Sequence, residues 1–478
     1  MLLASNNGHP VRRVHLIGLG GISMSGLAQV LLQSGFTVSG SDLKASPLTE
    51  RLTAEGVHFT VGHRPDNVEG SDLVVYTAAV RPDNVELARA RELRTPVMTR
   101  AELLGQVMEA AGAGVAVAGT HGKTTTTAMV GVILERAGLD PTVLVGGEVE
   151  DFGGNARIGG QGYLVAEACE FRESFLDLRP DIGVILNIDD DHLDYFHSLD
   201  HVAQAFRRFA ERVTAGGAAV LDFDDRLVRG IADGLPAEVL SYALTAEARW
   251  QARDIDFRGT PYPSFVALQD GRRVAQVELA VPGTHNVSNA LAAMAVGVRL
   301  GVEPEMAAES LAGFRGAHRR FELKGSHDGV TVYDDYAHHP TAIRSTLQAA
   351  RRLGAERLWC VFQPHLYSRT RDLLGSFARE LAAADRLVVT DIYAAREEDP
   401  GDVSSRDLAR LVAERGAEVC YLPDFEQIVE YLNRETRPGD VVMTMGAGDV
   451  HRVAERFVEG GPARSKDAKE DSHWRESS

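Results

Sequence analysis

Short apolar runs alternate with longer segments of helical spacing along most of the chain. Runs bounded by glycine or polar residues read as buried strands, and the segments between them repeat apolar residues every three or four positions. These runs lie at 14–17, 37–39, 73–79, 115–118, 163–170, 181–187, 330–333, 358–362, 387–391 and 440–445. This alternation predicts an α/β protein whose sheets are largely parallel.

The length of 478 residues exceeds what one hydrophobic core supports and predicts three domains. We expect a Rossmann-like N-terminal domain at 1–110 and a central P-loop-type ATPase domain at 111–314. A C-terminal Rossmann-like α/β domain would occupy 315–459. The polar segment 460–478 predicts a disordered tail.

Composition narrows the class of protein. Apolar residues make up 44% and charged residues 25%, which is ordinary for a globular protein. The sequence contains no run of 18 apolar residues, so no membrane-spanning helix is expected. Three widely spaced cysteines and a start that lacks signal-peptide features predict a cytoplasmic protein. A net charge of −18 argues against a nucleic-acid surface.

The segment 115–137 carries the most informative motif. An apolar run leads into Gly119-Thr120-His121-Gly122-Lys123-Thr124-Thr125, and a helical pattern follows. Backbone N–H groups at such a turn bind phosphate, a lysine reaches the β- and γ-phosphates, and a hydroxyl coordinates Mg²⁺. The spacing is shorter than in the usual P-loop, but the strand-before, helix-after context predicts that Lys123 and Thr124 serve ATP.

The N-terminal run is followed by a second glycine turn, with Gly18, Gly20 and Gly21, and with Ser23 at the third glycine position. Asp42 follows the next strand. This arrangement is typical of dinucleotide binding, but a UDP-sugar would suit the same helix N-terminus as well as NAD does.

Acidic and histidine residues follow two strands of the central domain. Glu167 and Glu170 end one strand, and 189–191 with His192 come after another. Such groups at strand ends are typical of Mg²⁺ and phosphate chemistry. For the three aspartates taken singly, a solvated acidic loop is the better interpretation, whereas Glu170 and His192 gain from their positions.

Two further clusters suggest ligand contacts. Asn286 and Asn289 are spaced to share a helix face beside His285, and a helix cap would explain only one Asn. In the third domain, histidine and arginine gather after the strands at 330–333 and 358–362, a composition suited to recognising a carboxylate.

At this point the motifs resemble one family, the Mur ligases. The matching segments are 20–28, 119–125, 285–289, 319–321, 334–340, 362–365 and 445–449, in order from about 14 to about 458. Within that family the motifs are most similar to members that join L-alanine to the carboxylate of UDP-N-acetylmuramate for peptidoglycan synthesis. The resemblance implies an ATP-dependent ligase that forms an acyl phosphate, which the amine of the amino acid attacks.

The resemblance also implies roles for individual residues. The UDP-sugar would be bound by Gly18, Gly20, Gly21, Ser23 and Asp42. ATP would be bound by residues 119–125, His285, Asn286, Asn289, Arg319 and Asp334. Mg²⁺, which Mn²⁺ could replace, would be held by Thr124, Glu170 and His192, and alanine would be bound by Tyr336, His338, His365 and Arg369. Lys123, His192 and Arg319 would be catalytic, and His192 or His338 could accept the proton of the amine. We expect a monomer or homodimer.

Three positions depart from the family pattern. Phe206 stands where some relatives carry a carbamylated lysine, so no carbamate is expected there. Leu366 replaces an arginine found in some alanine-specific ligases. The segment 169–173 is less acidic than is common in the family, which affects the expected ligands of a second metal.

Three alternatives remain open. The resemblance implies the first, because a related ligase of the family accepts a whole murein tripeptide, and the same fold could do so here instead of alanine. A nicotinamide-dependent dehydrogenase would use the turn at Gly18 with Asp42 but would leave the Lys123 loop unexplained. A non-catalytic protein with an inactive nucleotide site is disfavoured by the intact Lys123, Thr124 and Glu170.

Overall fold

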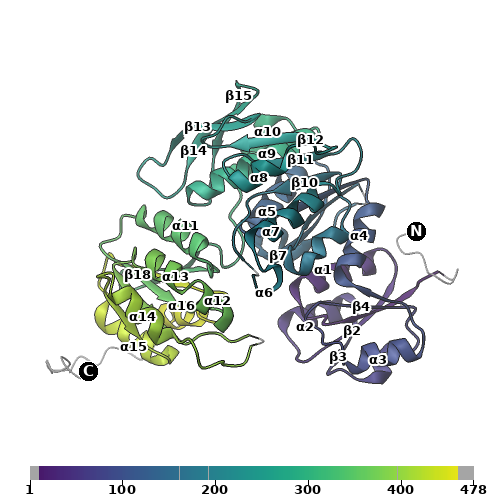
Figure 1. Cartoon of the computed structure of the whole chain (residues 1–478), viewed down its shortest axis with the longest axis horizontal. Coiled ribbons are helices and arrows are strands. Elements are labelled where there is room, and N and C mark those ends of the chain that lie inside the picture. The colour runs from purple at the N-terminus through teal and green to yellow at the C-terminus, as the bar shows by residue number, and fades with distance from the viewer. Residues whose placement is uncertain (1–9, 161, 192, 396, 461–478) are drawn as a thin grey trace. The chain divides into compact units, whose positions relative to one another are not determined.

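The computed structural model describes residues 10–160, 162–191, 193–395 and 397–460, without the side chains of 193 and 194. The chain divides into two compact units, Met1–His318 and Arg319–Ser478 (Figure 1). The predicted tail, apart from Gly460, lies outside the described residues. Among the helices that are described, none is both long and apolar enough to cross a membrane.

The N-terminal part of the first unit forms a five-stranded parallel sheet of order β3-β2-β1-β4-β5. Its elements are β1 Arg13–Ile17, α1 Ile22–Gln33, β2 Thr37–Asp42, α2 Pro47–Glu55, β3 His58–Val61, η1 Pro65–Val68, β4 Leu73–Tyr76, α3 Val85–Glu92, β5 Val97–Thr99 and α4 Arg100–Ala110. The β-α-β unit expected around the first glycine turn is therefore confirmed. Strand β2 extends to Asp42, so this carboxylate stands at the carboxyl edge of the sheet.

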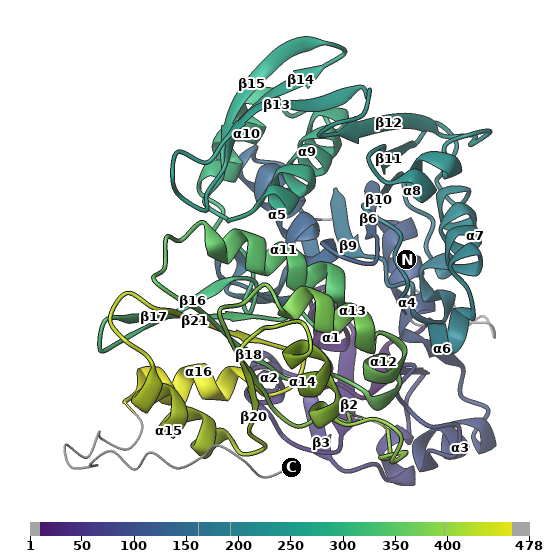
Figure 2. The same ribbon diagram turned by 60° about the vertical axis from the view of Figure 1, so that its left-hand side comes forward.

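A ten-stranded sheet forms the rest of the first unit, in the order β15-β14-β13-β12-β11-β10-β6-β9-β7-β8. Its elements are β6 Ala113–Ala118, α5 Lys123–Arg136, β7 Thr142–Val149, η2 Glu150–Phe152, β8 Gly154–Arg157, β9 Tyr163–Glu167, η3 Phe171–Asp177, β10 Ile182–Ile185, α6 Leu193–Phe196, α7 Leu199–Ala210, β11 Ala218–Asp222, α8 Arg226–Ile231, β12 Glu238–Ala243, β13 Trp250–Asp256, β14 Ser264–Gln269, β15 Arg272–Glu278, α9 Thr284–Arg299 and α10 Pro304–Ala312. In this order, the strands between β13 and β7 are all parallel to one another. At the two edges of the sheet, β14 and β15 on one side and β8 on the other pair in antiparallel fashion. Figure 2 shows β13, β14 and β15 continuing the sheet beyond β12.

Both faces are buried in the middle of this sheet, around β6 and β10, which explains the continuous apolar runs of these strands. Helices α5, α9 and α10 cover one face, where Val115, Val117 and Ile133 share a core with the alanine-rich α9. On the other face, residues of α1, α4, α7 and η3 share a second core with Ala116 and Ala118. Because helices of the N-terminal sheet contribute to that core, residues up to 318 pack as one unit.

The second unit is a six-stranded sheet of order β16-β17-β21-β18-β19-β20, parallel except for β16. Its elements are β16 Glu322–His327, β17 Val330–Asp335, α11 Pro340–Arg351, β18 Leu358–Phe362, α12 Tyr367–Asp372, α13 Leu374–Leu381, β19 Arg386–Val389, α14 Ser405–Ala413, β20 Val419–Tyr421, α15 Phe425–Glu435, β21 Val441–Met445 and α16 His451–Val458. Residues of α11, α13 and α14 are buried on one face of the sheet, and residues of α15 and α16 on the other. This layering matches the largely parallel α/β domain that the sequence predicts.

Candidate active site

The phosphate loop joins the carboxyl end of β6 to the start of α5. Gly119 and Gly122 have φ angles of +145° and +83°, which favour glycine. A Cβ on Gly119 would lie 2.9 Å from the Cβ of Leu186, and one on Gly122 would lie 2.7 Å from Oδ1 of Asn289. Both glycines are thus required by backbone conformation and by close neighbours.

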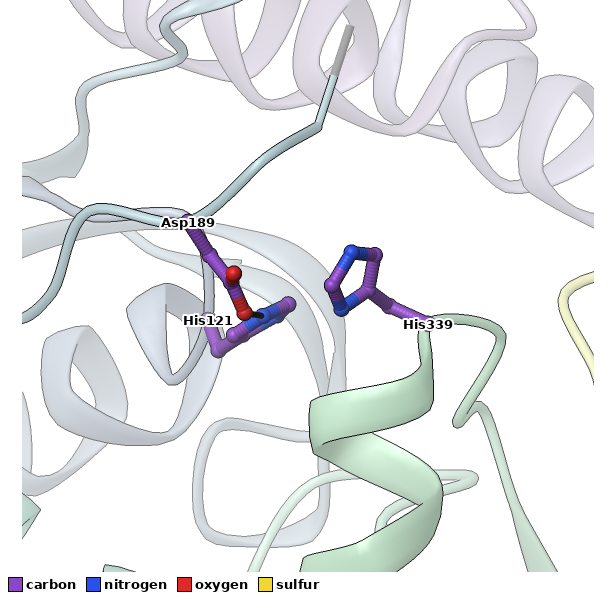
Figure 3. Close-up of side chains that lie close together, drawn as sticks. All are labelled: His121, Asp189 and His339. Atoms are coloured by element: carbon purple, nitrogen blue, oxygen red, sulfur yellow. Dashed lines mark hydrogen bonds and ion pairs between the residues drawn. The ribbon is translucent and has the colours of Figure 1, made fainter. Parts of the chain in front are cut away.

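The end of β10 holds this loop in place. The His121 amide donates to Oδ1 of Asn187 (2.7 Å), whose side-chain amide donates back to the carbonyl of His121 (3.0 Å). The backbone amide of Asp189 donates to the Thr120 hydroxyl (2.9 Å), and its Oδ2 lies 3.0 Å from Nε2 of His121 (Figure 3). The interpretation of Asp189 as a solvated acid is therefore wrong, because its carboxylate pairs with the loop.

Figure 3 also draws His339, which belongs to the second unit. Its backbone takes an extended conformation at the N-cap of α11, and its Nδ1 accepts from the amide of Thr341 (3.4 Å). We therefore describe His339 as a helix-capping residue of its own unit.

Lys123 points back into the loop and meets Glu170. Its Nζ donates to the carbonyls of Gly119 (2.5 Å) and Thr120 (3.1 Å), and it lies 3.0 and 2.9 Å from Oε1 and Oε2 of Glu170. The side chains of Lys123 and Glu170 are only 16% and 5% exposed. Burial lowers the pKa of Lys123, but the negative charge of Glu170 outweighs burial and raises that pKa above its ordinary value. Lys123 is therefore a cation at neutral pH.

The described residues offer oxygen ligands that fit a hard cation. Thr124 lies in the first turn of α5, and the buried carboxylate of Glu170 lies against Nζ of Lys123 at the end of the loop. Hydroxyl and carboxylate oxygens are the donors that Mg²⁺ prefers. Glu167 lies nearby, and its Oε1 accepts from the backbone amide of Gly146. His192, the third predicted metal ligand, lies outside the described residues.

Helix α9 begins at Thr284, six residues before the alanine-rich run, so both asparagines lie in its first two turns. The side-chain amide of Asn286 donates to the carbonyl of Pro282 (2.8 Å), and that of Asn289 donates to Oδ1 of Asn286 (3.0 Å). These bonds aim Oδ1 of Asn289 at Gly122 of the phosphate loop. His285 is exposed at the same helix end.

One acidic residue at this edge was missed by the sequence argument. Asp222 ends β11, and its Oδ2 accepts from the hydroxyl of Ser288 in α9 (3.1 Å). Burial raises the pKa of Asp222 to about 7. The apolar run 218–221 could have identified Asp222 from the sequence, because it predicts a strand that ends at this residue.

The first glycine turn is braced by the acid that follows β2. Oδ2 of Asp42 accepts from the amide of Gly20 (2.8 Å), and Oδ1 accepts from the amide of Leu43 (2.7 Å). A dehydrogenase would use this carboxylate to bind a ribose hydroxyl. In this structure the two carboxylate oxygens of Asp42 brace the backbone of the turn. Gly18 has a φ of +84°, while Gly21 and Ser23 lie at the start of α1.

Arg319, in the second unit, donates three hydrogen bonds from its guanidinium group. Its Nε donates to Oδ2 of the buried Asp334 (2.8 Å), and its two terminal nitrogens donate to the carbonyls of Gly448 (2.8 Å) and Gly446 (2.6 Å). Because a guanidinium carries five N–H donors, a bond from Arg319 to phosphate would not have to displace any of these three, and its contact with ATP stays a prediction. The guanidinium groups of Arg319 and Arg320 both lie over the ring of Tyr336, 5.2 and 5.0 Å from its centroid.

The four residues expected at the amino acid lie together in the second unit. Nδ1 of His338 lies 2.8 Å from the carbonyl of Tyr336, and the ring centroids of His338 and His365 are 5.8 Å apart. Arg369 lies 3.2 Å from Nδ1 of His365. Tyr393, not identified from the sequence, stacks on His365 at 5.7 Å. The ends of β17 and β18 thus form one polar, aromatic cluster whose role stays a prediction.

Comparison with known families matches three consecutive models along the chain. Residues 13–111 match the model described as Mur ligase family, catalytic domain. Residues 117–297 match the Mur ligase middle domain, and residues 319–448 match the Mur ligase, glutamate ligase domain. The three-domain α/β organisation is therefore confirmed, while the boundaries 1–110, 111–314 and 315–459 stay predictions.

Curated relatives and solved structures agree with these models. The chain is 51% identical to the UDP-N-acetylmuramate–L-alanine ligase of Caldanaerobacter subterraneus subsp. tengcongensis, covering 94% of this chain and 97% of the relative. It is 48% identical to the enzyme of that name from Acetivibrio thermocellus, covering 94% and 96%. The UDP-N-acetylmuramate–alanine ligase structure from Thermotoga maritima superposes with a TM-score of 0.79 at 31% identity, covering 94% and 98%. The chain belongs to the Mur ligase family.

Proposed function

We propose that this protein joins L-alanine to the carboxylate of UDP-N-acetylmuramate at the expense of ATP, in peptidoglycan synthesis. The observation that carries the proposal is 51% identity, over 94% of the chain, to a ligase of that name. The phosphate loop between β6 and α5 supplies the nucleotide site that this ATP-dependent reaction needs. The first glycine turn, at the helix N-terminus that follows β1, supplies a second site for a diphosphate.

Lys123 and the amides of residues 119–125 would hold the β- and γ-phosphates of ATP. Transfer of the γ-phosphoryl group to the sugar carboxylate requires positive charge around the moving group rather than covalent help. Lys123 carries that charge because Glu170 stabilises its protonated form. Oδ1 of Asn289 beside Gly122 and the exposed His285 would face the adenosine part of the nucleotide.

Thr124 and Glu170 would hold Mg²⁺, and we propose His192 as a further ligand. Mg²⁺ would neutralise phosphate charge, as in other phosphoryl-transfer sites, and Mn²⁺ could replace it. Removal of divalent cations with EDTA should abolish turnover, and added Mg²⁺ should restore it. Turnover that persisted in EDTA would contradict this assignment.

The amino acid would bind at the cluster of Tyr336, His338, His365 and Arg369. An arginine beside imidazoles suits the carboxylate of alanine, and the small side chain of alanine needs little space. The amine must be neutral to attack the acyl phosphate, so a neutral imidazole such as that of His338 would accept its proton. Attack by nitrogen forms the amide bond and releases phosphate. We place the reaction in the cytoplasm, carried out by a monomer or homodimer.

The test measures both products. Purified protein with Mg-ATP, UDP-N-acetylmuramate and L-alanine should release phosphate and form the ligated sugar nucleotide, detected by mass. Glycine, L-serine and a murein tripeptide serve as competing acceptors. Failure to form the alanine product would reject the proposal, and preferential ligation of the tripeptide would select the alternative acceptor. A Lys123→Ala variant should lose turnover and so exclude a contaminating ligase.

A further inference from the structure

Glu86 is a fully buried carboxylate in the first turn of α3, within the N-terminal sheet domain. Its Oε2 accepts from the hydroxyl of Ser41 (2.6 Å) and lies 3.2 Å from Nδ1 of His63. Its Oε1 accepts from the side-chain amide of Asn67 (2.5 Å) and from the backbone amide of Arg64 (3.3 Å). The cluster thus draws donors from the end of β2, the loop after β3 and η1.

A second imidazole approaches the same carboxylate from β1. Nε2 of the buried His15 lies 3.6 Å from Oε2 of Glu86, an electrostatic contact beyond hydrogen-bond distance. Burial by itself raises the pKa of Glu86, but the polar groups of His15, Ser41 and Asn67 outweigh it and lower the pKa to about 2. Glu86 is therefore ionised at neutral pH and collects donors from several separate segments.

Ser41 connects Glu86 to the first glycine turn. The carbonyl of Ser41 accepts from the amides of Gly18 (2.9 Å) and Leu19 (3.1 Å), while its hydroxyl donates to Glu86. The next residue, Asp42, accepts from the amide of Gly20. The position of the turn therefore depends on where Ser41 sits, and Glu86 fixes the side chain of Ser41.

The loop after β3 is tied to the same carboxylate. The amide of Gly62 donates to the carbonyl of Asp42 (2.7 Å), and His63, Arg64 and Asn67 then converge on Glu86. Since β1, β2 and β3 are parallel, their carboxyl ends form one edge, where open α/β sheets bind ligands. Glu86 lies beneath that edge.

We propose that Glu86 is a positioning residue for the UDP-sugar site: it holds the glycine turn through Ser41 and the 62–67 loop through His63 and Asn67. This inference rests on the proposed function, because it takes UDP-N-acetylmuramate as the ligand of this edge. Glu86 makes no contact with the ligand. Its contribution is to fix the backbone that does.

Glu86→Gln tests the proposal because it keeps the size of the side chain but leaves one acceptor oxygen where two now receive donors. The KM for UDP-N-acetylmuramate should rise by about ten-fold or more, since hydrogen bonds to a charged group are lost. The KM values for ATP and L-alanine, and kcat, should change by less than about two-fold, because the other sites lie on other elements. Glu86→Asp, which retains the charge, should recover part of the lost affinity.

Leu87→Ala is the matched control. Leu87 is the next residue of α3 and is also buried, but it packs with Ile17, Val68, Val74 and Ala90 rather than with the cluster at Glu86. It should lower thermal stability without changing the KM for UDP-N-acetylmuramate. Equal KM increases in Leu87→Ala and Glu86→Gln would overturn the proposal, because they would show a purely structural effect.

Titration calorimetry of the full-length protein with UDP-N-acetylmuramate tests the proposed function and the role of Glu86 separately. If the unaltered protein does not bind this nucleotide sugar, the proposed function fails. If the unaltered protein binds it and Glu86→Gln binds it equally well, the function stands and the role of Glu86 is refuted. If Glu86→Gln does not fold, Glu86→Asp and Ser41→Ala carry the same test, with Ser41→Ala expected to weaken binding because it removes the link to the turn.

Discussion

The ion pair between Lys123 and Glu170 allows a quantitative prediction. Nζ of Lys123 lies 3.0 and 2.9 Å from the two carboxylate oxygens, and both side chains are largely removed from solvent. Removing one member of a buried pair leaves an uncompensated charge and typically costs about 3–5 kcal/mol. We therefore expect Lys123→Met and Glu170→Gln each to destabilise the first unit by about that amount in the absence of nucleotide and metal.

The double variant should be much less unstable than the sum of the two single variants, because it leaves no buried charge unpaired. A coupling free energy of at least about 2 kcal/mol is expected from this double-mutant cycle. The exposed pair of Arg207 and Glu211, whose side chains are 42% and 46% exposed, is the control. The double-mutant cycle of this control pair should give a coupling free energy of less than about 1 kcal/mol.

Urea unfolding followed by the fluorescence of Trp250 measures these free energies in the correct unit. Trp250 is buried in the central sheet, whereas Trp359 is in the second unit. All variants are therefore built on a Trp359→Phe, Trp474→Phe background, which leaves Trp250 as the only tryptophan. Additive single effects, to within about 0.5 kcal/mol, would refute the conclusion that the two charges stabilise one another.

Three further outcomes follow from the geometry. Gly122→Ala should lower kcat/KM for ATP by at least about 100-fold, since its methyl group would lie 2.7 Å from Oδ1 of Asn289 at a φ of +83°; an unchanged ATP dependence would contradict the assigned loop geometry. Arg319→Lys should lower the free energy of unfolding of the second unit, measured by calorimetry, by about 2–4 kcal/mol. The reason is that one ammonium group cannot reproduce the bonds of Arg319 to Asp334 and to two carbonyls. An unchanged unfolding transition would contradict this prediction. The pKa of Glu86 is about 2 in the folded protein and 4.5 ordinarily, so its ionised form should stabilise the fold by about 3 kcal/mol above pH 4.5, and this stabilisation should be lost as the pH falls toward 2. The urea midpoint of Glu86→Gln should not show this pH dependence. Identical pH profiles of the urea midpoint in the two proteins would refute the prediction.

Local sequence signals located the nucleotide loop well because its chemistry is encoded within a few residues. Gly119, Gly122 and Lys123 lie within five residues, and both glycines have the positive φ angles that favour glycine in a tight turn. The strands on either side are apolar runs buried on both faces, so their pattern was easy to recognise. The same reasoning found the turn at Gly18.

Roles that depend on distant partners were harder to assign. Asp189 read as a solvated acid, but β10 places it beside His121, 68 residues earlier in the chain. Arg319 is expected at the nucleotide, a role that stays a prediction, but the sequence did not indicate its bonds to the 446–448 turn. Nothing near either residue in the sequence indicates these partners.

The sequence by itself determined the alternation of strands and helices, both glycine turns and membership of the family, since each depends on local pattern or on ordered motifs. The tertiary structure decided which groups share a charge or a hydrogen bond. Glu86 illustrates the difference: it is an ordinary acid in the sequence, 45 residues from Ser41, and only the parallel pairing of β1, β2 and β3 surrounds it with donors. Hydrophobic periodicity specifies which face of an element is buried, but the partner of a buried polar group is fixed only when the sheet order brings separate segments together.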